Sequence, residues 1–221
     1  TAVGQEALLG NTTGTRNTGV GAFSLYTAQT ANDNTAIGYE ALRLNTTGSS
    51  NTAVGTYALD ANTTASNNTA IGYQSLTDNT TGTSNVAVGM KAMFENTTGD
   101  YNTALGQAAL RDNTTADNNT AVGYAALLVN TGAENTAVGA NALAANTTGA
   151  ENTAFGANAL DANTTATGGA AFGKGALTSN TTGAENTALG STTLAFNTTG
   201  AYNTAVGNQA LKANTTADNN T

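Results

Sequence analysis

The groups in this chain that could do chemistry are carboxylates, hydroxyls and side-chain amides, because the sequence holds no Cys and no His. A thiol nucleophile, an imidazole base, a zinc site and a disulfide frame are therefore excluded. Glu134 and Glu151 hold equivalent places in consecutive copies of a repeated sequence, and Glu185 follows two copies later, so that stacked carboxylates could bridge a cation. Gly168 interrupts this series, and the calcium repeat Gly-Gly-x-Gly-x-Asp is absent. We interpret the glutamates as a solvated face.

Glycoside hydrolysis by paired carboxylates needs a cleft and one carboxyl group with a raised pKa. The acids of this chain occur only at variable, exposed places in the repeated sequence, which offers no such asymmetry. We therefore predict that the chain is not an enzyme and has no catalytic, cofactor-binding or metal-binding residues.

Three other recurring groups could bind a ligand or be modified. Asn-Thr-Thr recurs from Asn11 to Asn214 and fits the N-glycosylation pattern, although a ladder of turn residues is the simpler interpretation. Tyr39, Tyr73 and Tyr124 are equivalent in the repeat and could form an aromatic binding stripe, or be scattered packing or interface residues. Columns of Thr could present a flat, charge-free array to ice, or could serve only to complete turns and strands.

All of these residues belong to one repeat with the consensus N-T-A-V-G-x-x-A-L-x-x-N-T-T-G-x-x, whose positions we number one to seventeen. Only the step from Asn119 to Asn135 is shorter by one, because the segment Asn130-Thr131-Gly132 lacks one Thr. This deletion falls in a predicted turn, where a stacked coil tolerates a change of length. Charged residues occupy only positions six, seven, ten, eleven, sixteen and seventeen, which indicates that these positions face water.

Seventeen residues are too few for two antiparallel helices, and the consensus favours strands and turns over helix. Thr-Ala-Val predicts one strand that ends at a Gly of positive φ, and Ala-Leu predicts the centre of a second strand that ends at Asn-Thr-Thr-Gly. The predicted fold is an all-β parallel β-solenoid, with one repeat per turn and about thirteen turns. Residues 1–221 are predicted to form a single array. Because Thr1 starts at position two and Asn220-Thr221 opens a new repeat, we expect a segment of a longer fibre without end caps.

The large apolar residues of positions four and nine are predicted to point into the coil. This predicted core comprises Val3, Leu8, Val20, Leu25, Ile37, Leu42, Val54, Leu59, Ile71, Leu76, Val88, Met93, Leu105, Leu110, Val122, Leu127, Val138, Leu143, Phe155, Leu160, Phe172, Leu177, Leu189, Leu194, Val206 and Leu211.

Position five is predicted to be a turn glycine in every copy: Gly4, Gly21, Gly38, Gly55, Gly72, Gly89, Gly106, Gly123, Gly139, Gly156, Gly173, Gly190 and Gly207. Asparagines stacked in register can pass amide hydrogen bonds along a ladder. At position one the predicted ladder is Asn17, Asn34, Asn51, Asn68, Asn85, Asn102, Asn119, Asn135, Asn152, Asn186 and Asn203. The Asn of position twelve is expected to stack in the same way.

The burial and hydrogen bonding within one isolated coil only about balance the conformational entropy that ordering it costs. If positions four and nine point inward, alternation sends the Ala residues of positions three and eight outward, as a charge-free strip of small side chains. We therefore predict that the chain associates with itself as a homo-oligomer of parallel coils.

The segments Asn51-Thr-Ala-Val-Gly55 and Asn68-Thr-Ala-Ile-Gly72, followed by Ala58 and Ser75 at position eight, resemble the S-V-A-I-G-x-x-[AS] motif of YadA-like heads in trimeric autotransporter adhesins. The resemblance covers all thirteen copies, although the Asn-Thr-Thr-Gly half of the repeat is not part of the motif. It implies a left-handed parallel β-roll, assembled as a homotrimer on a bacterial surface, that binds a host or matrix surface. Similar arrays occur in phage-fibre-like proteins.

Together these features predict an extracellular or cell-surface structural or adhesive fibre segment. The alternatives are an ice-binding β-solenoid that uses Thr ladders and a phage tail-fibre shaft. Nucleic acid is not an expected partner, because six Lys and Arg face fourteen Asp and Glu. Direct membrane insertion of this segment is not expected either, because no apolar run approaches the ~20 residues that span a bilayer.

Overall fold

The computed structural model describes the whole chain, Thr1–Thr221. By its contacts the chain divides into two compact units, Thr1–Thr115 and Ala116–Thr221. The first unit holds the strands β1 (Ala2–Val3), β2 (Thr18–Val20), β3 (Thr35–Ile37), β4 (Thr52–Val54), β5 (Thr69–Ile71), β6 (Val86–Val88) and β7 (Thr103–Leu105). The second holds β8 (Thr120–Val122), β9 (Thr136–Val138), β10 (Thr153–Phe155), β11 (Ala170–Phe172), β12 (Thr187–Leu189) and β13 (Thr204–Val206).

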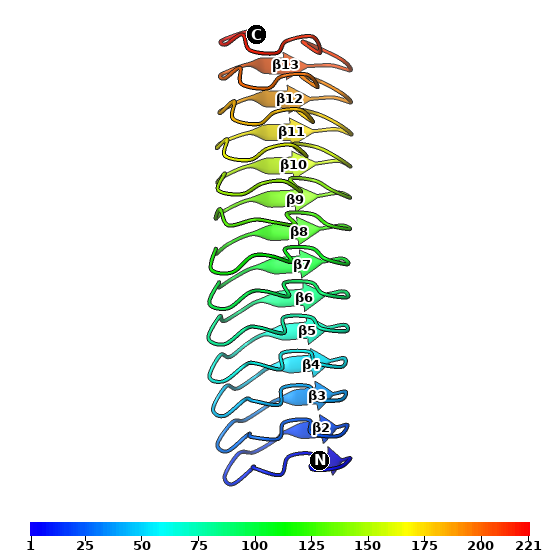
Figure 1. Cartoon of the computed structure of the whole chain (residues 1–221), viewed down its shortest axis with the longest axis vertical. Coiled ribbons are helices and arrows are strands. Elements are labelled where there is room, and N and C mark those ends of the chain that lie inside the picture. Colours follow the sequence, from blue (N-terminus) through cyan, green and yellow to red (C-terminus); the bar gives the residue numbers. More distant parts are fainter. The chain divides into compact units, whose positions relative to one another are not determined.

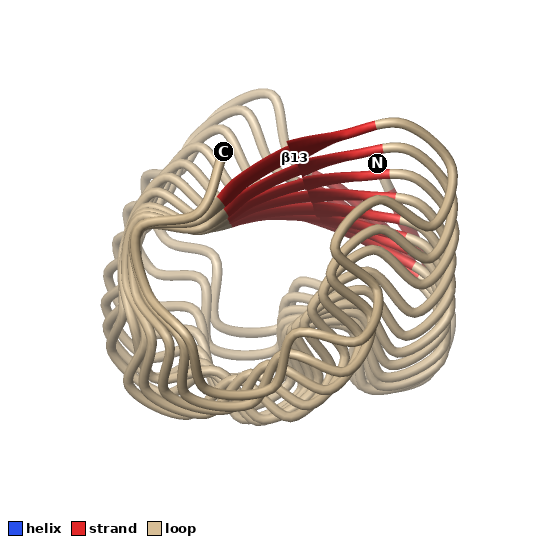
Figure 2. Cartoon of the chain, turned by 90° about the horizontal axis from the view of Figure 1, so that it is seen from above, coloured by secondary structure: helices blue, strands red, loops and turns tan.

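The fold is an all-β parallel β-solenoid of about 12 turns, without helices, in which each 17-residue repeat forms one turn. We call one such turn a coil. Within the first unit each strand pairs in parallel with the equivalent strand of the next coil, as Thr35 with Thr52 and Ile37 with Val54 (Figure 1). Figure 2 shows that the strand occupies one side of the coil and that irregular chain closes the rest. No helix has the length and apolar character that a bilayer crossing requires.

The deleted residue of the short repeat does not disturb the pairing in the second unit. There β8 and β9 pair in the usual register, with Thr120 beside Thr136 and Val122 beside Val138. The chain is shortened in the turn around Thr131, whose N–H donates to the carbonyl oxygen of Thr147 at 2.7 Å. The change of length is therefore absorbed outside the strands.

The second strand predicted around Ala-Leu is absent, which is a correction. Leu25 has a φ of 50° and Phe23 a φ of 59°, and equivalent residues at positions seven and nine share this left-handed conformation in both units. Alternating left-handed residues prevent an extended strand. The backbone of this segment still bonds to the adjacent coil, because the N–H of Leu25 donates to the carbonyl oxygen of Ala41 at 3.0 Å.

The interior of the coil is filled by position nine, by small residues and by asparagine. Leu42 and Leu59 are 0% exposed, and so are Ala36 of position three and Ala41 of position eight. At Gly19, which replaces Ala of position three, an added Cβ would lie 3.0 Å from Ser24 Oγ and 3.4 Å from Leu8 Cγ. Position three therefore faces positions eight and nine across the interior.

The prediction that position four forms part of the core is wrong. Ile37 is 42% exposed, Phe155 42% and Leu189 50%. None of the position-four residues is buried, namely Val3, Val20, Ile37, Val54, Ile71, Val88, Leu105, Val122, Val138, Phe155, Phe172, Leu189 and Val206. A strand of three residues turns only its middle residue inward, and the space opposite position nine admits a methyl group. The predicted outer strip of Ala therefore lies inside. Near the ends of the chain, Leu8 is half-buried and Leu211 is exposed.

The glycines of position five adopt the positive φ that was predicted, between 123° and 141°. The reason for their invariance is the stacking of one coil on the next. An added Cβ on Gly55 would lie 2.4 Å from the carbonyl oxygen of Gly72 and 2.7 Å from its carbonyl carbon. The coils therefore approach each other so closely at this corner that only glycine fits.

Candidate functional site

The side chains of positions two and four form a surface without charge, which we call the outer sheet face. In the first unit its apolar column consists of Val, Ile and Leu at position four, with Ile71 39% and Leu105 37% exposed. Beside it runs a column of half-exposed Thr, including Thr35, Thr52 and Thr69. The hydroxyl groups of these Thr residues make no hydrogen bond within the chain. They are therefore available to solvent or to a partner.

In the second unit the outer sheet face carries two larger side chains, in β10 and β11. The rings of Phe155 and Phe172 stack with centroids 5.5 Å apart and planes 8° from parallel. Leu189 and Val206 continue the column and are 50% and 67% exposed. Contiguous exposed apolar surface of this kind marks interaction sites on soluble proteins.

The asparagines of position one are structural and confirm the predicted ladder. Asn51 is 0% exposed. Its backbone N–H donates to Oδ1 of Asn34 at 2.9 Å, and its Nδ2 donates to the carbonyl oxygen of Ala65 at 2.9 Å. This ladder is therefore linked from side chain to backbone, and in some coils also from amide to amide, as from Asn152 Nδ2 to Oδ1 of Asn135 at 3.2 Å. At Gly169, which replaces Asn in this column, the backbone N–H still donates to Oδ1 of Asn152 at 2.9 Å.

The asparagines of position twelve form a second ladder, in which one side-chain amide bonds to the next. Asn62 Nδ2 donates to Oδ1 of Asn45 at 2.8 Å and to the carbonyl oxygen of Ala65 at 3.1 Å. Position thirteen adds a column of hydroxyls, because Thr46 Oγ1 donates to the carbonyl oxygen of Thr63 at 3.0 Å. These amides and hydroxyls form hydrogen bonds within the chain, unlike the Thr hydroxyls of the outer sheet face.

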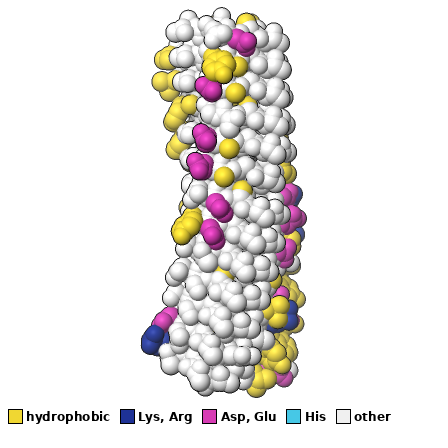
Figure 3. All heavy atoms as spheres, turned by 90° about the vertical axis from the view of Figure 1, so that its left-hand side faces the viewer, with side chains coloured by type: hydrophobic (Ala, Val, Ile, Leu, Met, Phe, Trp, Pro, Cys, Tyr) yellow, Lys and Arg dark blue, Asp and Glu magenta, His cyan; other side chains and the backbone are white.

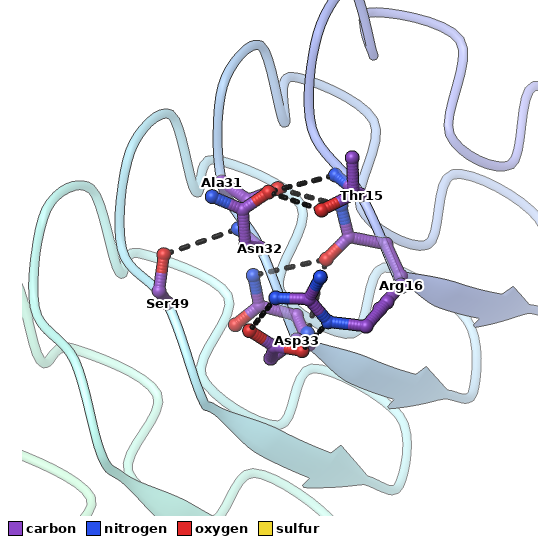
Figure 4. A network of polar contacts seen from close by, with 8 residues as sticks. Thr15, Arg16, Ala31, Asn32, Asp33 and Ser49 are labelled. Carbon is purple, nitrogen blue, oxygen red and sulfur yellow. Dashed lines mark hydrogen bonds and ion pairs between the residues drawn. The ribbon is translucent and has the colours of Figure 1, made fainter.

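The corner at positions sixteen and seventeen of the first unit is held by polar side chains from successive coils (Figure 4). The N–H of Thr15 donates to Oδ1 of Asn32 at 2.8 Å, and the N–H of Asn32 donates to Oγ of Ser49 at 3.1 Å. Arg16 forms a bidentate pair with Asp33, and this hydrogen bond lowers the pKa of the Asp33 carboxyl group. Both side chains are exposed, so the pair contributes little to stability.

A second group of charges lies beside an aromatic cluster in the first unit. Arg43 Nε is 2.9 Å from Glu40 Oε2 and 2.9 Å from Asp60 Oδ1. The hydrogen bond with Glu40 raises the pKa of Tyr39. Burial raises the pKa of Asp78, with a smaller contribution from the charge of Asp60.

The aromatic cluster joins residues that the sequence interpretation had not grouped. The ring of Phe23 meets those of Tyr26 and Tyr39 edge to face at 6.0 and 6.1 Å, and Tyr39 meets Tyr57 at 5.5 Å. An open cavity of about 280 Å³ lies beside Tyr26, lined by Leu9, Gly10, Thr12, Tyr26, Thr27 and Gln29. The predicted alternative of a stripe through Tyr39, Tyr73 and Tyr124 has no ring contact among its members.

The glutamates Glu134, Glu151 and Glu185 are all exposed. No group of three or more acidic side chains in the structure converges in a way that could hold a metal ion. On the face drawn in Figure 3 the acidic side chains are spread along the surface rather than gathered in a hollow.

No family model, curated protein or solved structure matches the chain. The apolar column of the outer sheet face remains partly exposed in both units. The face is uncharged, combines the apolar column of position four with the Thr column of position two, and repeats in register along each unit.

Proposed function

We propose that this chain is a segment of an extracellular or cell-surface structural or adhesive fibre, in which parallel copies associate through the outer sheet face. The observation that carries the proposal is the exposed column of Val, Ile, Leu and Phe at position four. Large apolar side chains at the surface lose contact with water when a second copy covers them. Every coil adds one such side chain, so that affinity grows with the number of repeats.

The geometry of the repeat favours a second copy of the same chain as the occupant. In-register parallel pairing places equivalent side chains about 4.8 Å apart along the stack, and only another stack with the same spacing matches this column over its whole length. The charged positions six, seven, ten, eleven, sixteen and seventeen lie off the face. The resemblance to YadA-like heads supports three as the number of copies and a left-handed coil.

The adhesive part of the proposal rests on the aromatic cluster of Phe23, Tyr26, Tyr39 and Tyr57. Tyr39 is 42% exposed, the other three rings are half-buried, and the cluster lies next to the ion pair of Glu40 and Arg43. Aromatic and Arg side chains are common at recognition surfaces. The four rings lie at variable positions of the repeat, where substitution leaves the ladders intact. In a fibre, such positions carry the differences between one coil and the next.

A second candidate function, ice binding, is favoured by one specific observation. The Thr hydroxyls of position two make no hydrogen bond within the chain and alternate with Val and Ile on an uncharged parallel sheet. The Thr residues of position thirteen, by contrast, donate to backbone carbonyl groups. If ice is the ligand, it meets positions two and four of the first unit and not the Thr ladder of the turn.

Light scattering after size exclusion separates the two candidates. The wild-type chain is expected to elute as a trimer. Ile37→Lys with Ile71→Lys should dissociate it, because two cations would be buried in each interface. The matched control is Thr47→Lys with Thr81→Lys, which adds the same charges in the same coils at exposed position fourteen and should leave the trimer intact.

A monomeric wild-type chain would overturn the fibre proposal. Thermal hysteresis of the ice–water transition, measured on the same three chains, tests the other candidate. Ice binding requires hysteresis in the wild-type chain that the substitutions at Ile37 and Ile71 abolish and the control substitutions leave unchanged.

A further inference from the structure

The sequence contains two kinds of Asn-x-Thr acceptor motif, which occupy different positions of the repeat. Asn-Thr-Thr begins at position twelve in eleven copies, and Asn-Asn-Thr begins at position seventeen in three, at Asn67, Asn118 and Asn219. Enzymes that attach N-linked sugars require this pattern and modify the nitrogen of the first Asn. The surroundings of that nitrogen therefore decide where the folded chain can carry a sugar.

At position twelve the amide nitrogen is enclosed. Asn79 is 0% exposed, and its Nδ2 donates both to Oδ1 of Asn62 at 3.1 Å and to the carbonyl oxygen of Gly82 at 2.9 Å. A glycosylated nitrogen keeps one hydrogen, so one of these two bonds would be lost, and the attached ring would displace the neighbouring coil. Nine members of this set are buried: Asn45, Asn62, Asn79, Asn96, Asn113, Asn146, Asn163, Asn180 and Asn197. The other two, Asn11 and Asn214, lie near the ends of the chain and are not buried.

At position seventeen the asparagine side chains are accessible instead of enclosed. Asn67, Asn118 and Asn219 are exposed and have φ values of 63°, 58° and 58°, in the left-handed region that Asn tolerates better than most residues. The side chain of Asn67 makes no hydrogen bond within the chain. Its neighbours in the column are Ser50 and Ser84, whose small side chains leave room for a sugar ring.

We infer that Asn67, Asn118 and Asn219 are positions at which the folded chain accommodates an N-linked sugar, and that a sugar on any of the nine buried asparagines is incompatible with the fold. In the modification, the amide nitrogen attacks the anomeric carbon of a nucleotide-activated hexose. A carbon–nitrogen bond forms, the bond from the anomeric carbon to the diphosphate oxygen breaks, and the amide proton passes to a base of the transferase. The inference concerns the single chain and does not depend on the proposed function.

Co-expression with a soluble transferase that moves one glucose from UDP-glucose to the Asn of Asn-x-Thr tests this, because the enzyme meets the chain before it folds. Soluble, protease-resistant chain is then separated from insoluble chain, and mass spectrometry maps glucose on both. We expect glucose on Asn67, Asn118 and Asn219 in the soluble fraction, and glucose on the nine buried asparagines only in the insoluble fraction. Soluble, protease-resistant chain with glucose on Asn62 or Asn79 would overturn the inference.

A second variant keeps the test decisive if nearly all wild-type chain becomes insoluble. Replacing the Thr of position fourteen by Ala in the nine affected coils destroys those motifs and keeps every Asn of the ladder. The replaced residues are Thr47, Thr64, Thr81, Thr98, Thr115, Thr148, Thr165, Thr182 and Thr199. This variant should stay soluble with the transferase present and carry glucose on Asn67, Asn118 and Asn219. The inference fails if the variant becomes insoluble only when these three are glycosylated, or if they remain unmodified while a denatured sample of the variant accepts glucose there.

Discussion

The interior of the coil and the outer sheet face are built from the same three-residue strand, but they constrain the sequence in opposite ways. Inside, Ala at position three faces a fully buried Leu and two columns of buried Asn. Outside, position four varies from Val to Phe and remains partly exposed. The interior admits few departures from one side chain at each position, such as Gly19, Thr193 and Met93, whereas the outer face requires only that the side chain be apolar. Near invariance therefore marks the inside of this solenoid, and apolar character alone does not.

The largest expected loss of stability comes from adding a side chain to a glycine of position five, at the corner where the coils approach each other closely. In Gly72→Ala the new Cβ would lie 2.6 Å from the carbonyl oxygen of Gly89, at a φ of 136°. Backbone strain of this kind costs about 1–3 kcal/mol before the clash is counted. We expect a loss of at least about 3 kcal/mol in the free energy of unfolding, measured by denaturant titration. Thr56→Ala, next to Gly55 in the preceding coil, is the control and should change stability little.

A pair of substitutions in one coil compares the two regions directly. Leu76→Ala removes a fully buried side chain and should cost about 2–5 kcal/mol at every protein concentration. Ile71→Ala removes a side chain that is 39% exposed, and its cost should depend on concentration because it weakens association rather than the coil. Melting curves at several chain concentrations distinguish these cases. Equal, concentration-independent losses would contradict the division into an inside and an outside.

The ladder of position one offers a pair of adjacent asparagines with opposite surroundings. In Asn68→Ala the buried N–H of Asn85 loses its partner at 2.9 Å, whereas the carbonyl oxygen of Gly82 keeps the hydrogen bond from Asn79 Nδ2. An unsatisfied buried N–H costs about 1–3 kcal/mol, so the expected loss is about 1–3 kcal/mol. Asn67→Ala changes the exposed neighbour and should cost less than about 1 kcal/mol. Hydrogen exchange at Asn85 should accelerate in the first variant only.

Much of the fold follows from the spacing of residues in the sequence. The constant step of seventeen predicts parallel pairing in register, and the invariant Gly predicts the corner at which φ is positive. The single step of sixteen predicts a shortened turn rather than a broken strand. Each of these inferences depends on periodicity, which reports that equivalent residues stack on one another.

The direction in which each side chain points could not be obtained in the same way. Ala and Val are neighbours in the strand and neither is charged. The positions of the charged residues therefore do not show which of the two side chains points into the coil. Size then favoured Val as the inward residue, although Leu and two Asn already fill the interior. The left-handed φ of Leu25 could not be predicted from the sequence either, because Leu rarely adopts this conformation. The aromatic cluster was missed because its rings come from positions six, seven and ten of successive coils.

The smallest expected effect on stability concerns Asp161, a half-buried acid at position ten of the second unit. Burial raises the pKa of its carboxyl group in the folded chain, whereas in the unfolded chain the pKa keeps its ordinary value. The folded state therefore binds the proton more tightly, and the contribution of Asp161 to the free energy of unfolding increases as the pH falls through the folded pKa. Asp161→Asn should stabilise the chain at pH 7, and this gain should vanish as the pH falls below the ordinary pKa of Asp, near 4. Melting temperatures of both chains between pH 7 and about pH 2 measure the difference.

Asp33 is expected to show the opposite pH dependence, because Arg16 lowers the pKa of Asp33. Asp33→Asn should cost stability at pH 7 and nothing once the pH falls below this lowered pKa. If both substitutions changed stability in the same direction with pH, burial of Asp161 and the ion pair of Asp33 would not explain the pH dependence of the two positions.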